Sequence, residues 1–234
     1  MKKLLFYIYI TTPTWISLII GLLSALTASD IVTLAIVSEL LAILLLYLSR
    51  KIEFELFRKM IHMAGMLVLI SAIHISIDKS ILLLVIGIIF ILSIPVYFFP
   101  KAFPDIIKDL AVRSVRSNGR SIRCITHFMI SAFVMLLLFP YNLVMIGLIV
   151  ALIGDPAAFI IGSRYGKKKI INNKTLEGSL AFFLAVFVVL LLLGQGIATA
   201  ILASATGTVV ENISGRYIDD NATIPFAAAL VLAI

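Results

Sequence analysis

The segment from Gly154 to Ser179 places an acid, spaced small residues and four lysines between two apolar stretches. Asp155 begins the pattern, and small residues follow it at offsets of 3, 7 and 11: Ala158, Gly162 and Gly166. In a helix these offsets fall along one face. Such a face either packs as a small-residue seam against another helix or lets a ligand approach the backbone. Because an acid at the centre of a membrane helix costs about 2.5–3.5 kcal/mol, Asp155 is a candidate functional residue.

A strongly basic loop follows this face. It carries, in order, Lys167, Lys168, Lys169, Lys174, Thr175, Glu177 and Gly178. It is not a P-loop, because the glycine-to-lysine spacing is one residue short and no Ser or Thr follows the lysine. A basic loop of this kind can fold over phosphate groups, and its carboxylate is available to a metal ion.

Polar residues of the same kinds recur near the end of the chain and upstream. Glu211 shares a helical face with three small residues, Ala200, Ser204 and Gly207, and Asp219, Asp220 and Asn221 follow it. Carboxylate and amide oxygens suit a Mg²⁺–nucleotide, although the same residues also form turns. Upstream, one helical face holds Arg58, Lys59 and His62. These side chains serve either as an interfacial anchor or as donors to a phosphate.

The elements that position these residues are apolar. Of 234 residues, 62% are hydrophobic and 13% charged, which excludes an ordinary soluble domain. Stretches near the roughly 20 residues that cross a bilayer recur along the chain. We expect an all-α polytopic membrane protein, a single domain over 1–234, with nine spans at about 5–28, 31–49, 60–77, 80–99, 124–139, 141–163, 178–195, 196–213 and 222–234. Asp155 can cap a helix and Pro156 suits a first turn, so we expect the sixth span to be broken near Asp155.

The charges predict how these spans are oriented. With a cytoplasmic N-terminus, one side of the membrane receives every Lys and Arg except Lys79, as the positive-inside rule requires. The net charge of +7 is thereby concentrated on the cytoplasmic face. That face is expected to contact anionic lipid headgroups or a phosphate-rich ligand, and we expect no nucleic-acid partner.

Taken together, the motifs resemble those of a known family. Asp155-x-x-Ala158-x-x-x-Gly162-x-x-x-Gly166 followed by Lys174-Thr175-x-Glu177-Gly178-Ser179 is similar to the signature of the CTP-dependent lipid kinases. That family includes dolichol, phytol and yeast-type diacylglycerol kinases and is related to the CDP-lipid cytidylyltransferases. Arg58-Lys59-x-x-His62 resembles its upstream motif, and Glu211 with "DDNATIP" resembles its C-terminal one. The resemblance covers residues 58–225, and residues 1–57 carry none of these motifs.

The resemblance implies that the γ-phosphate of CTP passes to a membrane alcohol of the dolichol or polyprenol, phytol, geranylgeraniol or diacylglycerol type, with Mg²⁺ as cofactor. It implies catalytic roles for Asp155, Lys59 and His62, and metal ligation by Asp155, Glu177 and Asp220. The implied nucleotide-binding residues are Arg58, Ala158, Gly162, Gly166, Lys167, Lys168, Lys169, Lys174, Thr175, Gly178 and Asn221. Their active site would face the cytoplasm.

Two other functions fit the same residues. A CDP-lipid cytidylyltransferase would use similar cations and a metal on a different phosphorus. A transporter or flippase would suit a broken helix and buried acids, but it favours two repeated halves, and the Asp155 motif occurs once. The sequence sets neither the lipid alcohol nor the oligomeric state.

Overall fold

The structure is a computed structural model that describes residues 54–74, 77–98, 120–214 and 220–234. These residues form seven α-helices and one short 3₁₀ turn. The helices are α3 (Phe54–His74), α4 (Lys79–Phe98), α6 (Arg120–Leu138), α7 (Tyr141–Tyr165), α8 (Leu176–Leu192), α9 (Ile197–Ile213) and α10 (Asp220–Leu232), and the turn is η2 (Ile171–Asn173). Within these ranges no strand forms, and one isolated antiparallel bridge joins Lys169 to Thr175. The all-α prediction is therefore confirmed for the described part of the chain.

Each of these helices overlaps one of the expected spans, and the expected spans 5–28 and 31–49 lie outside the described residues. One of the seven, α7, is long and apolar enough to cross a membrane, with 25 residues. The apolar parts of the other six are shorter, between 10 and 17 residues.

Helix α7 is continuous where the sequence suggested a break. It runs from Tyr141 to Tyr165 with Pro156 in its interior, so the expected break near Asp155 is wrong. Proline lacks the N–H that would bond the carbonyl of Leu152, one turn earlier, and it normally kinks a helix. Helices in apolar surroundings tolerate this when neighbouring helices pack against them. Here α8 and α10 both contact α7.

The chain divides into two compact units, Met1–Met129 and Ile130–Ile234. In the first unit, α3 buries Met66, Leu69 and Ile73, and α4 buries Leu82 and Val85. Residues separated by three or four positions lie on one helical face. In each of these two helices, the named buried residues therefore lie on one side of the helix.

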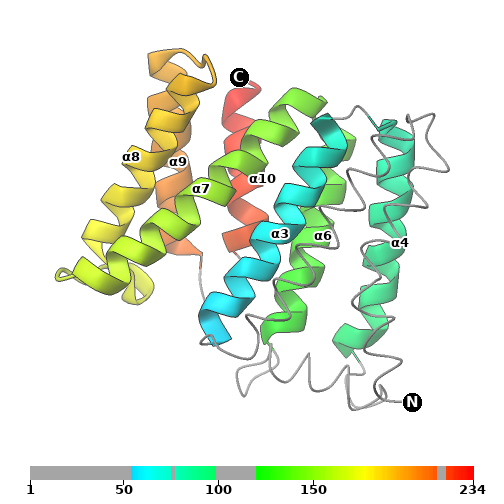
Figure 1. Cartoon of the computed structure of the whole chain (residues 1–234), viewed down its shortest axis with the longest axis horizontal. Helices are drawn as coiled ribbons and strands as arrows, with labels where there is room; N and C mark the ends of the chain where they lie inside the picture. The colour runs from blue at the N-terminus through cyan, green and yellow to red at the C-terminus, as the bar shows by residue number, and fades with distance from the viewer. Residues whose placement is uncertain (1–53, 75–76, 99–119, 215–219) are drawn as a thin grey trace. The chain divides into compact units, whose positions relative to one another are not determined.

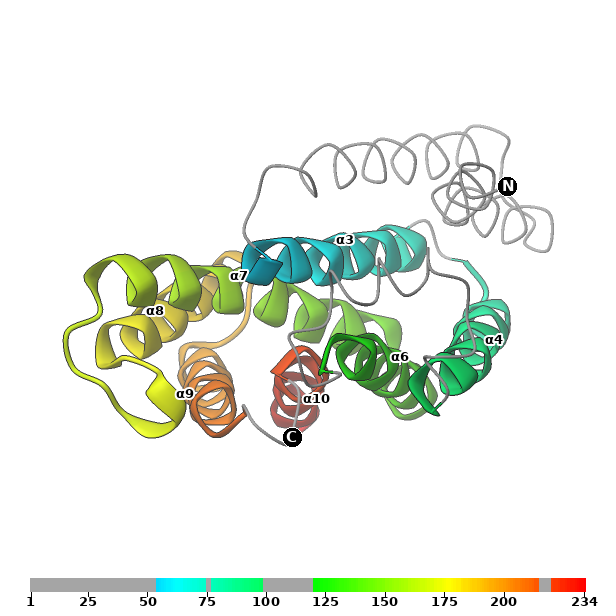
Figure 2. The same ribbon diagram turned by 90° about the horizontal axis from the view of Figure 1, so that it is seen from below.

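In the second unit, four helices contact one another in a closed cycle. Helix α7 touches α8 and α10, and α9 touches the same two helices. Figures 1 and 2 show α8, α9 and α10 next to one another, with α7 running across them. Small residues allow this close packing: a Cβ placed on Gly147 of α7 would lie 2.5 Å from the carbonyl oxygen of Pro225 in α10. The backbones of α7 and α10 are therefore in direct contact.

A single aromatic ring fills the space between α7, α8 and α9. Phe182 of α8 is completely buried. A Cβ placed on Gly154 of α7 would lie 2.5 Å from Phe182 Cε2, and a Cβ on Gly207 of α9 would lie 2.9 Å from Phe182 Cε1. The ring therefore rests on two glycines. Asp155 directly follows the first of them in the sequence, and Glu211 stands one turn after the second.

Candidate functional site

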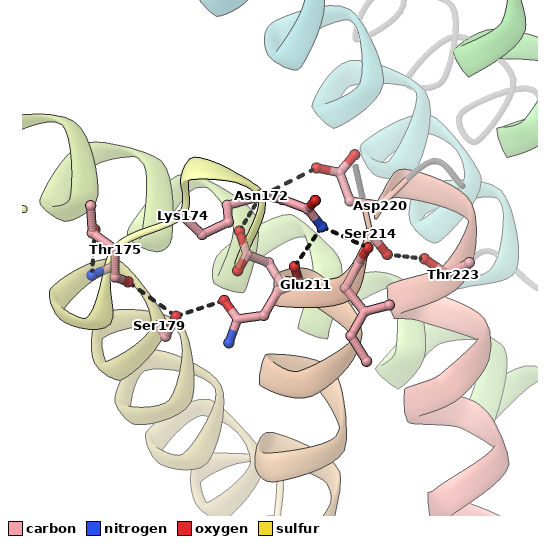
Figure 3. A network of polar contacts seen from close by, with 11 residues as sticks. Asn172, Lys174, Thr175, Ser179, Glu211, Ser214, Asp220 and Thr223 are labelled. Carbon is pink, nitrogen blue, oxygen red and sulfur yellow. Dashed lines mark hydrogen bonds and ion pairs between the residues drawn. The ribbon is translucent and has the colours of Figure 1, made fainter. Parts of the chain in front are cut away.

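Lys174 lies at the centre of a group of acidic residues drawn from three helices. Its ammonium group donates a hydrogen bond to the Glu211 carboxylate of α9 and lies 4.0 Å from a carboxylate oxygen of Asp220 on α10. Figure 3 shows these three side chains converging. Asp155 of α7 is buried and lies close enough for its charge to act on Lys174. We call these four residues the Lys174 cluster.

The electrostatics of the cluster favour a permanently charged lysine. Burial alone lowers the pKa of Lys174, but the neighbouring charges of Glu211, Asp220 and Asp155 outweigh it and raise the pKa above its ordinary value of 10.5. The Glu211 side chain is 3% exposed and the Lys174 side chain 27% exposed. One ammonium group therefore stands near three carboxyl groups in a partly buried environment, where charge–charge interactions are stronger than in water.

Lys174 is presented by a short, ordered hairpin formed by residues 166–175, which we call the basic arm. At its base, Leu176 N–H donates to the carbonyl of Lys168 at 2.9 Å, beside the Lys169–Thr175 bridge. Nearer the tip, Ile170 N–H donates to the carbonyl of Lys174 at 2.8 Å. The arm is therefore a defined structure and not a loose loop over the site.

The tip of the basic arm is fastened to the end of α9. Asn172 has a left-handed backbone (φ 57°), and its Nδ2 donates to the carbonyls of Asn212 at 3.1 Å and Ile213 at 3.0 Å. These are among the last carbonyls of α9, which have no partner within the helix. Nearby, Ser179 Oγ of α8 donates to Asn212 Oδ1 at 2.7 Å. The end of α9 is thus joined to both the arm and α8.

The first turn of α8 packs against the face of α7 that carries the small residues Ala158, Gly162 and Gly166. Thr175 is the N-cap of α8, and its hydroxyl accepts a hydrogen bond from Gly178 N–H at 3.2 Å. A Cβ on Gly162 would lie 2.9 Å from Thr175 Oγ1, a Cβ on Gly166 2.8 Å from the same oxygen, and a Cβ on Gly178 2.9 Å from the Ala158 carbonyl oxygen. Of the two interpretations of this face, the structure therefore favours the helix–helix seam. Nucleotide contact by these residues stays a prediction.

Glu177 occupies a different place from the other predicted metal ligands. Its carboxylate accepts hydrogen bonds from the backbone N–H groups of Lys167 at 3.0 Å and Lys168 at 3.3 Å. Its own backbone N–H and then these two amides lower its pKa below the ordinary 4.5. In the structure Glu177 ties the base of the basic arm to the first turn of α8, where the helix dipole also favours an acid.

The remaining predicted residues divide between the two units. In the second unit, Lys167, Lys168 and Lys169 are exposed along the basic arm, and Asn221 lies in the first turn of α10. In the first unit, Arg58, Lys59 and His62 belong to α3. The His62 ring is buried and packs edge-on against Phe128, with ring centroids 6.4 Å apart. Contact of these three with a nucleotide stays a prediction.

Comparison with known proteins identifies relatives of this chain. It is 32% identical over 186 residues to MJ1137, an uncharacterized protein of Methanocaldococcus jannaschii, and the match covers 76% of this chain and 92% of MJ1137. The chain belongs to the MJ1137 family. It is also 30% identical over 131 residues to RP860, an uncharacterized protein of Rickettsia prowazekii, covering 53% of this chain and 64% of RP860. No family model and no solved structure matches the chain.

The donor groups of this MJ1137-family member suit a cation that is bound together with phosphate. Within the described ranges, no three His, Cys, Asp or Glu side chains are grouped as a complete protein-only metal site. Magnesium, however, is usually held by one or two carboxylates plus substrate phosphates. Glu211 and Asp220 already hold one cation, the Lys174 ammonium group. Metal ligation by Asp155 and Asp220 together with a nucleotide stays a prediction.

Three residues of the site were not among those predicted from the sequence: Asn172, Asn212 and Phe182. An Asn-Asn pair within a loop signals a left-handed turn, but not which helix end it will contact. Phe182 lies in an apolar run of α8 and looks like any other core residue. Glu211 was noticed because it lies in an apolar segment, whereas its partnership with Lys174 depends on tertiary structure.

Proposed function

We propose that this protein is a membrane-embedded lipid-alcohol kinase that transfers the γ-phosphate of CTP to an isoprenoid alcohol or to diacylglycerol. One observation carries the proposal. Two motifs that resemble those of the lipid kinases, one with Asp155 and Lys174 and one with Glu211 and Asp220, supply these four residues to a single cluster. Buried charged residues are costly in a membrane protein, so a protein with a purely structural role would not be expected to contain such a cluster.

In this reaction the bond between the γ-phosphorus and the β–γ bridging oxygen breaks, and the lipid oxygen forms a new bond to the same phosphorus. CDP leaves, and the hydroxyl proton of the alcohol passes to the carboxylate of Asp155. Phosphoryl transfer depends mainly on positioning and charge stabilisation. Mg²⁺, when bound, supplies charge neutralisation of the phosphates. Asp155 orients the alcohol through its hydroxyl proton, and Lys174 contacts the transferred phosphoryl group.

The other cations of the chain complete the proposed nucleotide site. The exposed lysines of the basic arm, Lys167, Lys168 and Lys169, contact the outer phosphates. The family resemblance also implies roles in the transfer for Lys59 and His62 of α3, and these roles belong to the same proposal. The proposal that the nucleotide is CTP also rests on that resemblance. The charges and spacing of these residues indicate that phosphate groups bind, but they do not indicate which base the nucleotide carries.

The arrangement in the membrane belongs to the same proposal. The chain is proposed to cross the bilayer nine times with a cytoplasmic N-terminus, so that the basic arm lies on the cytoplasmic side. A lipid alcohol is already dissolved in the bilayer and reaches the Lys174 cluster laterally between helices. CTP reaches the same cluster from the water. The boundary between lipid and water is thus the place where the two substrates meet.

The test uses the purified chain in detergent with γ-labelled CTP, Mg²⁺ and a panel of lipid alcohols. Label is expected in an organic-phase lipid, and Asp155→Asn is expected to lose at least about 100-fold in rate, as is typical for a group acting on the transferred proton. Asp78→Asn is the matched control, because Asp78 caps the start of α4 through Ser80 N–H at 2.8 Å and asparagine caps equally well.

Two other results would replace the proposal. Formation of a CDP-lipid and pyrophosphate from α-labelled CTP and a phospholipid acceptor would establish a cytidylyltransferase. Absence of both products from a folded preparation would reject a nucleotide-dependent transferase and leave transport as the function to test.

A further inference from the structure

The basic arm is fixed at two places, and Lys174 stands between them. At the base, Leu176 N–H bonds the Lys168 carbonyl, and Glu177 accepts from the amide of Lys167. At the tip, Asn172 donates to two carbonyls at the end of α9. Lys174 follows Asn172 by two residues and reaches Glu211, which is one residue before Asn212 on the same helix. The tip contact and the ion pair therefore join the arm to neighbouring points of α9.

We propose that Asn172 is a positioning residue that holds the Lys174 ammonium in its cluster by fastening the arm to the C-terminal carbonyls of α9. Lysine has a long, flexible side chain, so its ammonium group stays at one point only when its backbone is held. Without the tip contact, the arm is held only by its base and by the Lys174–Glu211 ion pair itself. The arm would then pivot, and the ammonium group would leave Glu211 and Asp220 more often.

A simpler explanation for Asn172 makes a different prediction, and the chain provides its own control. Asn172 and Asn173 both have left-handed backbones, with φ of 57° and 62°, and asparagine tolerates that conformation better than most residues. If conformation alone explains the pair, the two positions are equivalent. Among the described residues, however, only Asn172 of this pair makes side-chain hydrogen bonds to α9. The proposal therefore requires that the two positions differ.

The matched variants are Asn172→Gly and Asn173→Gly. Glycine adopts a left-handed backbone without strain, so both variants keep the turn and only the first loses the contact with α9. The readout is the rate at which an amine-reactive reagent modifies Lys174, measured by mass spectrometry on the full folded chain in detergent. The exposed lysines of the same arm, Lys167 to Lys169, are the internal reference. Glu211→Gln serves as the positive control, since it removes the ionic partner of Lys174.

In the wild-type chain Lys174 is expected to react more slowly than the reference lysines. Asn172→Gly removes two hydrogen bonds at an exposed site, and each contributes about 0.5–1.5 kcal/mol to holding the arm. We therefore expect Lys174 modification to become about 10-fold faster in Asn172→Gly and to stay unchanged in Asn173→Gly. Equal rates in the two variants, whether raised or unchanged, would overturn the proposal. So would a wild-type Lys174 that reacts as fast as Lys167 to Lys169.

The role of Asn172 in catalysis rests on the proposed function, and the labelling separates the two questions. If CTP-dependent transfer occurs, Asn172→Gly is expected to lower kcat/KM for CTP by a factor similar to the rise in labelling, while Asn173→Gly leaves it unchanged. If no transfer occurs in the wild-type chain, the proposed function fails but the labelling comparison still decides the role of Asn172. Loss of transfer in Asn172→Gly without any change in Lys174 labelling would reject positioning through Lys174.

Discussion

The Phe182 ring provides a quantitative test of how α7, α8 and α9 pack. Phe182 is fully buried between Gly154 and Gly207, so Phe182→Ala leaves a cavity at the meeting point of the three helices. Phe→Ala changes in protein cores cost about 3–5 kcal/mol. In the proposed membrane setting, lipid is as apolar as the removed ring, so we expect a loss at the lower end, about 3 kcal/mol, in the free energy of unfolding.

The two glycines allow the same contact to be tested from the other side. A Cβ on Gly207 would lie 2.9 Å from the ring, and a Cβ on Gly154 2.5 Å from it, so each Gly→Ala change is expected to cost about 1–3 kcal/mol by overpacking. In the Phe182→Ala background the new methyl group enters the vacated space. The Gly207→Ala cost should then largely disappear, which gives a coupling energy of about 1–3 kcal/mol.

Gly65→Ala is the matched control for the intrinsic effect of Gly→Ala in a helix. A Cβ at Gly65 in α3 would lie 3.5 Å from Phe128, an ordinary contact, and alanine forms helices better than glycine by about 1 kcal/mol. This variant is expected to be neutral or more stable. The assay is reversible unfolding in mixed micelles followed by circular dichroism. If Gly207→Ala costs the same with and without the Phe182 ring, the proposed packing of the ring is wrong.

Three further predictions concern charge. Lys174→Met should lower the free energy of unfolding by about 3 kcal/mol, because it leaves the buried Glu211 carboxylate without its cation; Glu211→Gln should cost less, because Asp220 still lies beside Lys174, and a double-mutant cycle should show the double variant losing less than the sum. The raised pKa of Lys174 means that its stabilisation is complete below pH 10.5 and is lost as the pH rises through the folded-state value; unfolding measured through the alkaline range should show this loss in the wild-type chain and not in Lys174→Met. The lowered pKa of Glu177 has the opposite sign: its contribution is present above pH 4.5 and disappears as the pH falls through the lower folded-state value. Glu177→Gln should therefore flatten the acid limb of stability, whereas a shift only in the Mg²⁺ concentration needed for activity would indicate that Glu177 is a metal ligand.

The positions of the described helices could be predicted from the sequence, because each is a largely apolar segment bounded by charged or turn-forming residues. The expected span 141–163 and the observed α7 (Tyr141–Tyr165) illustrate this agreement. The path of α7 past Pro156 was mispredicted, because local capping signals were weighed without the helices that pack around it. A proline removes one hydrogen bond, and tertiary contacts decide whether the helix ends there.

The candidate site could be predicted only in part. Asp155, Lys174 and Asp220 were identified by residue type and motif, and the structure brings them together. Glu177 was assigned to a metal by the same reasoning, yet it bonds backbone amides of Lys167 and Lys168. Sequence spacing gives the helical face on which a residue lies, but not its partners in the folded chain. Metal ligation by Glu177 stays a prediction.

In the second unit, α7, α8, α9 and α10 contact one another in a closed cycle, and this has a consequence for biosynthesis. Helix α10 both contributes Asp220 and closes the cycle by contacting α7 and α9. The ribosome makes α10 after the other three helices, so a nascent chain can pair Lys174 with Glu211 before the last carboxylate exists. Until α10 arrives, the face of α7 that carries Gly147 has no partner for its close backbone contact with Pro225. Insertion of α10 between two helices already in place would therefore be the final assembly step, and one that completes the ionic cluster and the packing together.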